Sequence, residues 1–178
     1  MRYYIHGYES SPTSAKAVLF QETLHAQPIT YRKGNPEDLV IADCLKRISQ
    51  VIINDPQVAF IGSSLGGFLA TSLALDHTNI THLVLLNPAI LPPDIDVTTI
   101  KGIPRRILED MINPRFFQHK ILAKIIIIRG TQDEVVPDSW ILGFAKAQAA
   151  TLHLLNDDHR FSKNLQKLPE IIAEFLQQ

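Results

Sequence analysis

A serine set among glycines is the strongest chemical signal in this sequence. Residues 62–67 read GSSLGG, so Gly62, Ser64 and Gly66 fit the pattern G-x-S-x-G. In this pattern the serine occupies a strained turn between a strand and a helix, and side chains at the flanking glycines would collide with neighbouring backbone. Ser64 is therefore the candidate nucleophile, and Ser63 occupies the variable position. By chance alone, about one chain in twenty of this length contains the motif. In such chains the residues are only a helix start rich in serine and glycine.

A serine hydroxyl becomes a nucleophile when a base takes its proton and a carboxylate orients that base. In sites built on such a turn, the acid and then the histidine follow the serine along the chain. The histidines after Ser64 are His77, His82, His119, His153 and His159. His153 is expected inside a strand, and His77 and His82 flank the turn after the serine's helix. His159 lies in a loop directly after the last predicted strand, which makes it the candidate base rather than an ordinary surface histidine.

The acid is expected in the loop after the preceding strand. That loop reads GTQDEVVP over residues 130–137 and contains Asp133 and Glu134. We choose Asp133, with Glu134 and Asp138 as alternatives. Asp138 is more simply explained as a charge at the start of a helix.

A metal site is a competing interpretation of Asp157, Asp158 and His159. Adjacent residues rarely converge on one ion, and no second cluster of histidines supports such a site. We therefore predict neither a metal nor a cofactor.

Short aliphatic runs alternate with amphipathic stretches along the chain. Strands are predicted at residues 2–6, 29–31, 58–61, 83–86, 125–128 and 151–155. Helices are predicted at residues 11–25, 65–77, 137–149 and 168–176. Another has its start signal at residues 35–38 and runs to residue 52, and residues 105–112 are a further candidate. Continuous apolar strands that alternate with helices indicate a parallel sheet covered on both faces. The predicted fold class is α/β: a three-layer α/β/α sandwich with a mostly parallel sheet of five or six strands.

The alternation breaks between Asn87 and His119, where the segment holds five prolines. We interpret residues 91–119 as a lid or cap inserted over the sheet edge, within a single domain that spans residues 1–178. An apolar set supports this: Ile90, Leu91, Ile95, Ile100, Ile103, Ile107, Leu108 and Met111. These residues could cover a hydrophobic acyl site, or they could only pack the insertion onto the sheet.

Composition excludes several classes of protein. The chain has 178 residues, a mass of 20.0 kDa, 46% hydrophobic residues and a net charge of −1. It therefore has enough apolar material for a core, and no broad attraction to nucleic acid follows from its charge. The one cysteine, Cys44, rules out an internal disulfide framework. No run is apolar and long enough for a membrane helix or signal peptide, so we expect a soluble, cytoplasmic protein without membrane insertion.

Several sequence blocks resemble those of small α/β-hydrolases and follow one another in the same order as in that family. Within it, the chain is most similar to the YqiA-like esterases. The blocks are Tyr4 to Tyr8, Ser10 to Pro12, Ser14 to Ala17, Ile61 to Gly67, Asn87 to Ala89, Gly130 to Val135, and Asp158 with His159. The resemblance implies a catalytic triad of Ser64, Asp133 and His159. It also implies an oxyanion hole formed by the backbone amides of Tyr8 and Leu65.

The chain departs from the family pattern in two places. Arg160 follows His159 where a smaller or apolar residue is expected, and residues 101–119 match nothing in the family pattern. His6 lies in a turn that resembles the family's His-Gly-aromatic turn, and it is better explained as a structural histidine than as a proton carrier.

The predicted function is hydrolysis of a small carboxylic ester through an acyl-enzyme on Ser64, as in serine carboxylesterases. The alternatives are an acyl thioesterase with the same triad and a non-catalytic binding protein that retains the fold. The expected partner is a small-molecule ester or thioester, and no nucleic acid.

Overall fold

Six apolar segments form one parallel sheet in the computed structural model, which describes residues 1–177. The strands are β1 (Arg2–Ile5), β2 (Gln27–Pro28), β3 (Val58–Ser63), β4 (Ile80–Leu86), β5 (Lys124–Gly130) and β6 (Thr151–Leu155). Their order in the sheet is β2-β1-β3-β4-β5-β6, and each neighbouring pair is parallel. Every residue of β3 is buried, as the continuous apolar run predicts for a strand covered on both faces.

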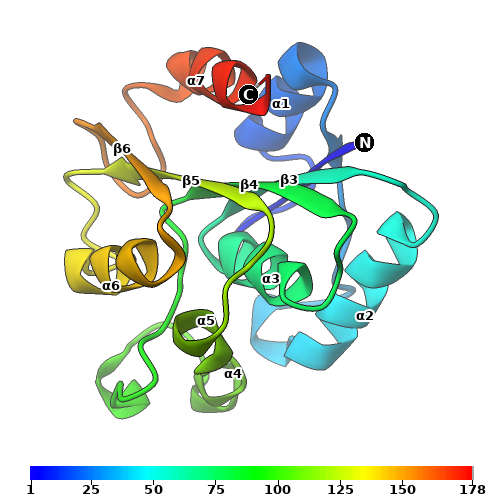
Figure 1. The fold of residues 1–178 in the computed structure, drawn as a ribbon. Coiled ribbons are helices and arrows are strands. Elements are labelled where there is room, and N and C mark those ends of the chain that lie inside the picture. Colours follow the sequence, from blue (N-terminus) through cyan, green and yellow to red (C-terminus); the bar gives the residue numbers. More distant parts are fainter. Residues whose placement is uncertain (178) are drawn as a thin grey trace.

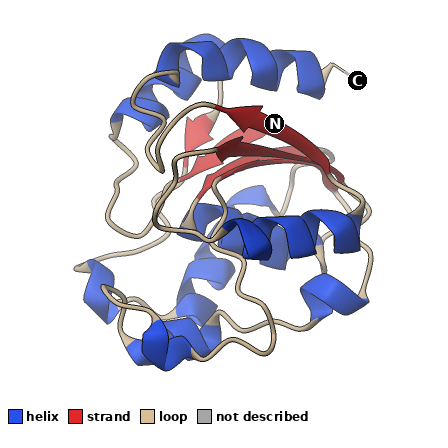
Figure 2. Cartoon of the chain, turned by 90° about the vertical axis from the view of Figure 1, so that its left-hand side faces the viewer, coloured by secondary structure: helices blue, strands red, loops and turns tan. Residues whose placement is uncertain are grey.

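Helices cover both faces of this sheet (Figures 1 and 2). On one face lie α1 (Ala15–Leu24) and α7 (Leu168–Leu176), and on the other lie α2 (Ile41–Ile52), α3 (Leu65–Ala74) and α6 (Asp138–Gln148). Successive strand residues feed the two cores in turn: Phe60 packs on the α2–α3 side, and Ile61 packs on the α1–α7 side. The predicted three-layer α/β/α sandwich is confirmed, with the sheet fully parallel.

The topology brings the ends of β1 and β3 together. From β1 the chain moves outward to β2, and from β3 it moves in the opposite direction through β4 and β5 to β6. Ligands of open α/β sheets bind beyond the carboxyl ends of the strands at such a reversal. The residues after β1 and β3, Gly7 and Ser64, therefore lie where a ligand site is expected.

Two elements near the N-terminus differ from the sequence prediction. Helix α1 begins at Ala15 with Ser14 as its N-cap, because Ser11 instead closes a turn by accepting a bond from the Ser14 amide at 3.2 Å. The second strand is Gln27–Pro28 rather than residues 29–31. These two residues pair with Tyr3 and Tyr4 of β1, and the Ile29 amide donates to the Tyr4 carbonyl at 2.9 Å.

The helix predicted to start near Asn35 starts later. Pro36–Asp38 form a single 3-10 turn, the Asn35 side chain makes no cap hydrogen bond, and α2 begins at Ile41. Its buried face consists of Ile41, Cys44, Ile48 and Ile52, and Leu45 packs, partly buried, against the same core.

The chain between β4 and β5 holds a 3-10 turn (Val97–Thr99) and two short helices, α4 (Arg105–Asp110) and α5 (Arg115–Gln118). Both helices lie farther from the sheet than α3 (Figure 1). Phe116 of α5 is buried and packs edge-on against Phe68 of α3 and Phe144 of α6. Within residues 1–177, no helix has the length and apolar character needed to cross a membrane.

Candidate active site

Ser64 occupies the tight turn between β3 and α3. Its backbone has φ 52° and ψ −117°, a conformation that is strained for any residue with a side chain. The turn requires its glycines: a Cβ on Gly62 would lie 2.5 Å from the Gly66 carbonyl oxygen, and one on Gly66 would lie 2.0 Å from that of Ile5. The sequence therefore dictates a turn that exposes the Ser64 hydroxyl beyond the end of the sheet.

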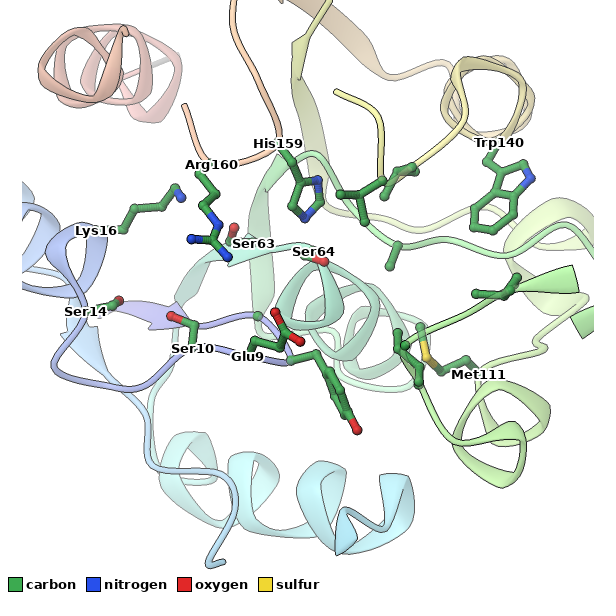
Figure 3. A pocket seen from close by; sticks show the side chains of 18 of the residues that line it. Glu9, Ser10, Ser14, Lys16, Ser63, Ser64, Met111, Trp140, His159 and Arg160 are labelled. Atoms are coloured by element: carbon green, nitrogen blue, oxygen red, sulfur yellow. The ribbon is translucent and has the colours of Figure 1, made fainter. Parts of the chain in front are cut away.

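The side chains of Asp133 and His159 contact each other across two loops. His159 Nδ1 lies 2.8 Å from Asp133 Oδ2, and the imidazole points toward Ser64 (Figure 3). The other carboxylate oxygen, Asp133 Oδ1, accepts hydrogen bonds from the amides of Val135 at 2.7 Å and Val136 at 3.1 Å. Ser64 and His159 line one cavity. The three residues predicted from the sequence thus lie together.

The alternative acids lie elsewhere. Glu134 is exposed, and Asp138, in the first turn of α6, binds Arg129 through Oδ1 at 2.8 Å. Of these three carboxylates, Asp133 is the one in contact with His159.

Asp133 is held in its ionised form. Burial by itself raises the pKa of this carboxyl, but the hydrogen bond and charge of His159 and the two backbone amides outweigh it and lower the pKa below its ordinary value. A buried carboxylate that stays charged can stabilise a protonated imidazole.

Arg129, at the end of β5, is a buried cation that the sequence analysis did not identify as part of the site. Its guanidinium pairs with Asp133 and donates to the Asn87 side chain at 3.3 Å and the Val136 carbonyl at 2.8 Å. Asn87 in turn donates to the carbonyl of His159 at 3.1 Å. This network links the loops that carry the acid and the histidine. The sequence signal that could have identified Arg129 is that a charged residue directly follows a run of four isoleucines in a predicted buried strand.

Two aspartates brace the loop that carries His159. Asp157, fully buried, accepts hydrogen bonds from the amides of Asp158, Lys163 and Asn164 at 2.7–3.1 Å. Asp158 accepts from the amides of Arg160 at 2.9 Å and Ser162 at 3.0 Å, and from the Ser162 hydroxyl at 2.6 Å. Burial works to raise the pKa of Asp157, but these bonds outweigh it and lower the pKa. Both carboxylates thus hold backbone, and residues 1–177 contain no group of three or more His, Cys, Asp or Glu side chains suited to a metal ion.

The turn after β1 lies against Ser64. A Cβ on Gly7 would lie 3.3 Å from Ser64 Cβ. The amides of Tyr8 and Leu65 donate to none of the turn, loop or cap carbonyls of residues 1–177. Arg32, another residue the sequence analysis missed, fixes this turn by donating to the carbonyls of Tyr8 and Ser10.

His6 has a structural environment. Its ring is 1% exposed, stacks on Tyr31 with centroids 4.4 Å apart, and lies 2.9 Å from the Gly7 carbonyl through Nδ1. Burial lowers its pKa to about 4, so the ring is neutral near pH 7.

The remaining histidines lie outside this site. His82 is near the start of β4, at the opposite end of the sheet, and packs edge-on against Phe175. His77 lies 3.2 Å from the Ser49 hydroxyl, and His153 lies within β6 as predicted.

The cavity around Ser64 and His159 has a volume of about 630 Å³ and two chemically different arms (Figure 3). Met111 and Trp140 lie in the apolar arm. The cavity lining also includes the apolar side chains of Leu91, Ile100, Ile103, Leu108 and Val135. The polar arm is lined by Ser10, Ser14, Lys16, Ser63 and Arg160, with Glu9 close by. Trp140 is half-buried against the core and also lines the cavity.

The comparisons with solved structures define the class of this fold. Est1E from Butyrivibrio proteoclasticus matches with a TM-score of 0.81 at 21% identity, over 98% of this chain and 86% of Est1E. The esterase Pf2001 from Pyrococcus furiosus matches with a TM-score of 0.73 at 17% identity, over 99% and 82% of the two chains. The mouse alpha/beta hydrolase domain-containing protein 10 matches with a TM-score of 0.70 at 19% identity, over 98% and 88%. The chain therefore has the α/β-hydrolase fold.

Within that class the family is also defined. The model of the uncharacterised protein family UPF0227 matches residues 1–177, and the chain belongs to this family. It is the YqiA-like family, so the resemblance found in the sequence blocks is confirmed. No curated protein matches the chain in sequence.

Proposed function

We propose that the protein is an esterase that hydrolyses small carboxylic esters through an acyl-enzyme on Ser64. The observation that carries this proposal is the arrangement of three side chains. His159 contacts the buried Asp133 at 2.8 Å, and its imidazole faces Ser64, which lies in a strained turn. Nucleophile, base and orienting acid are the minimum set for acyl transfer by a hydroxyl group. The solved esterases with the same fold are consistent with this chemistry.

In the first half-reaction, Ser64 Oγ attacks the ester carbonyl carbon while His159 Nε2 takes the hydroxyl proton. The carbonyl oxygen becomes an oxyanion, and the amides of Tyr8 and Leu65 are the proposed donors to it. The tetrahedral intermediate then expels the alcohol, which leaves with the proton from His159. Asp133 accepts a hydrogen bond from Nδ1–H of His159, which keeps the proton on Nδ1 and leaves Nε2 free to act as the base.

In the second half-reaction, His159 removes a proton from water, and the resulting hydroxide attacks the acyl-enzyme. Collapse of the second intermediate returns the proton to Ser64 Oγ and releases the carboxylic acid. The two steps consume one ester and one water and regenerate the enzyme.

Residues 91–119 form, in this proposal, a lid over the acyl part of the substrate. The support is the apolar lining of the cavity, to which Leu91, Ile103 and Leu108 all contribute. Several members of the same apolar set are fully buried, Ile107 among them, so packing and substrate cover are combined in one segment.

The test is hydrolysis of 4-nitrophenyl butyrate by the purified protein and by Ser64→Ala, with an S-butyryl thioester measured beside it. We expect ester hydrolysis well above background in the wild type and background rates in the variant. Hydrolysis of neither compound would support the non-catalytic alternative, and a specificity constant more than tenfold higher for the thioester would support the thioesterase alternative.

A further inference from the structure

The polar arm of the cavity contains two cations to which the proposed reaction gives no role. Lys16 lies in the first turn of α1, and Arg160 directly follows His159. Both side chains lie on the same side of Ser64, and the apolar arm with Met111 and Trp140 lies on the other (Figure 3). A substrate bound at Ser64 therefore has one end near apolar side chains and the other near these cations.

The charges of Lys16 and Arg160 are not neutralised by ion pairs. Among residues 1–177, neither side chain belongs to an ion pair. The nearby carboxylates of Asp157 and Asp158 are engaged by backbone amides and by Ser162. Burial lowers the pKa of Lys16, and the charge of Asp158 offsets this only in part. The Lys16 ammonium lies over the Phe161 ring, 5.9 Å from its centroid, and this contact does not neutralise its charge. A partly desolvated cation without a carboxylate partner favours an anionic ligand.

The floor of the polar arm adds hydroxyl groups and the positive end of a helix. Ser14 caps the ten-residue helix α1 by accepting a hydrogen bond from the Ala17 amide at 3.4 Å. The buried hydroxyl of Tyr4 interacts with the side chains of Ser14 and Ser63. A helix N-terminus attracts negative charge, so it acts in the same direction as the two cations.

One carboxylate, Glu9, is found among the described residues that line the cavity, together with three cations, Lys16, Lys101 and Arg160. Glu9 would repel an anionic ligand, whereas the cations would attract it. The effect of each charge on the binding of an anionic ligand can be measured, because each charged side chain can be replaced separately.

We propose that the polar arm, through Lys16 and Arg160, binds an anionic group, a carboxylate or a phosphate, on the alcohol part of the ester. The preferred substrates are then esters whose leaving alcohol carries a negative charge and whose acyl group enters the apolar arm. This inference rests on the proposed esterase function and specifies its substrate class. It also gives Arg160, the residue that departs from the family pattern, a role in substrate binding.

The test compares butyrate esters that share an acyl group and differ in leaving-group charge. The anionic substrate is 4-carboxyphenyl butyrate, and 4-carbamoylphenyl butyrate is its neutral counterpart of nearly equal size. A third ester, 4-(phosphonooxy)phenyl butyrate, distinguishes a phosphate site from a carboxylate site. We expect kcat/KM for the better anionic ester to exceed that for the neutral ester by about tenfold or more, the effect of one charge-assisted hydrogen bond. The preference should shrink at high salt.

The variants test which residues recognise the charge. Lys16→Met and Arg160→Met should each reduce the anionic-to-neutral ratio, and the double variant should bring it near one. Glu9→Gln should raise the ratio because it removes the opposing charge. Lys167→Met, an exposed lysine outside the cavity, is the matched control and should leave the ratio unchanged.

Binding of the leaving alcohols separates this inference from the esterase proposal. Calorimetry on Ser64→Ala should show that 4-hydroxybenzoate or 4-hydroxyphenyl phosphate binds at least tenfold more tightly than 4-hydroxybenzamide. If that selectivity depends on Lys16 and Arg160 while no ester is hydrolysed, the anion site stands and the esterase proposal fails. If esters are hydrolysed through Ser64 but charge changes neither rate nor binding, the anion site is wrong and the esterase proposal stands.

Discussion

Replacing Asp133 by asparagine exchanges one buried oxygen for an amide nitrogen at the centre of the site. The carboxylate side chain is fully buried, and its Oδ2 contacts both His159 and Arg129. In Asp133→Asn, the carbonyl oxygen can keep the bonds from the amides of Val135 and Val136 only if the NH₂ group takes the Oδ2 position. A donor then faces Nδ1 of His159 and the guanidinium of Arg129, both of which need an acceptor.

Two magnitudes follow from this arrangement. An NH₂ group facing Nδ1 favours the imidazole tautomer with its proton on Nε2, which cannot accept the serine proton. In the serine-protease example this substitution costs about 10⁴ in kcat, or roughly 5.5 kcal/mol of activation free energy. Leaving a buried arginine without one of its carboxylate partners costs about 3–5 kcal/mol of stability, and Asp138 and Asn87 remain as partners, so we expect the lower end.

The assay measures kcat on 4-nitrophenyl butyrate and the thermal midpoint for wild type, Asp133→Asn and Glu134→Gln. Glu134 is the exposed neighbour in the same loop and serves as the matched control. We expect a folded Asp133→Asn protein with kcat reduced by about four orders of magnitude, and a Glu134→Gln protein close to wild type. A folded Asp133→Asn protein within tenfold of wild-type kcat, or a crippling effect of Glu134→Gln, would refute this role for Asp133.

Three further predictions test the cavity, the buried histidine and the turn. If residues 91–119 close the apolar arm, kcat/KM for nitrophenyl esters should rise with acyl length by roughly 0.8 kcal/mol per methylene and peak between two and six carbons, whereas a rate still rising at twelve would indicate an open groove. Because burial lowers the pKa of His6 to about 4, the unfolded state binds more protons than the folded one below about pH 6.5. The free energy of unfolding should therefore fall by roughly 3 kcal/mol between pH 6.5 and 4, and denaturant titrations of His6→Gln should lose this slope while those of exposed His25→Asn keep it. Gly66→Ala places a Cβ 2.0 Å from the Ile5 carbonyl oxygen, so we expect either no folded protein or a displaced turn with little esterase activity, and a folded variant with wild-type kcat would contradict the assigned turn geometry.

The sequence predicts the elements that depend on local pattern. The apolar strand over Val58–Ser63 and the glycines around Ser64 leave few alternatives to a strand, a tight turn and a helix. Helix Leu168–Leu176 and strand Thr151–Leu155 have the predicted bounds. The helix starts are less certain from sequence, because Ser11, Ser14 and Asn35 carry similar capping signals and only tertiary contacts choose among them.

The partners of the site residues depend on long-range contacts. Arg129 and Asn87 are 42 positions apart and meet only because β4 and β5 are neighbours in the sheet. Arg32 reaches the turn after β1 across 24 positions. No local spacing encodes these pairs, so sequence analysis could find the candidate triad and could not find the residues that hold it in place.

In the proposed reaction Ser64, and no other residue, carries the acyl group. The most direct measurement is reaction of the protein with a fluorophosphonate probe, followed by intact mass and peptide mapping. Ser63→Ala is the matched control because Ser63 is the adjacent hydroxyl and also lines the cavity. We expect one probe per molecule on Ser64, retained in Ser63→Ala and lost in Ser64→Ala. Labelling that persists in a folded Ser64→Ala protein, or that maps to another residue in the wild type, would contradict it.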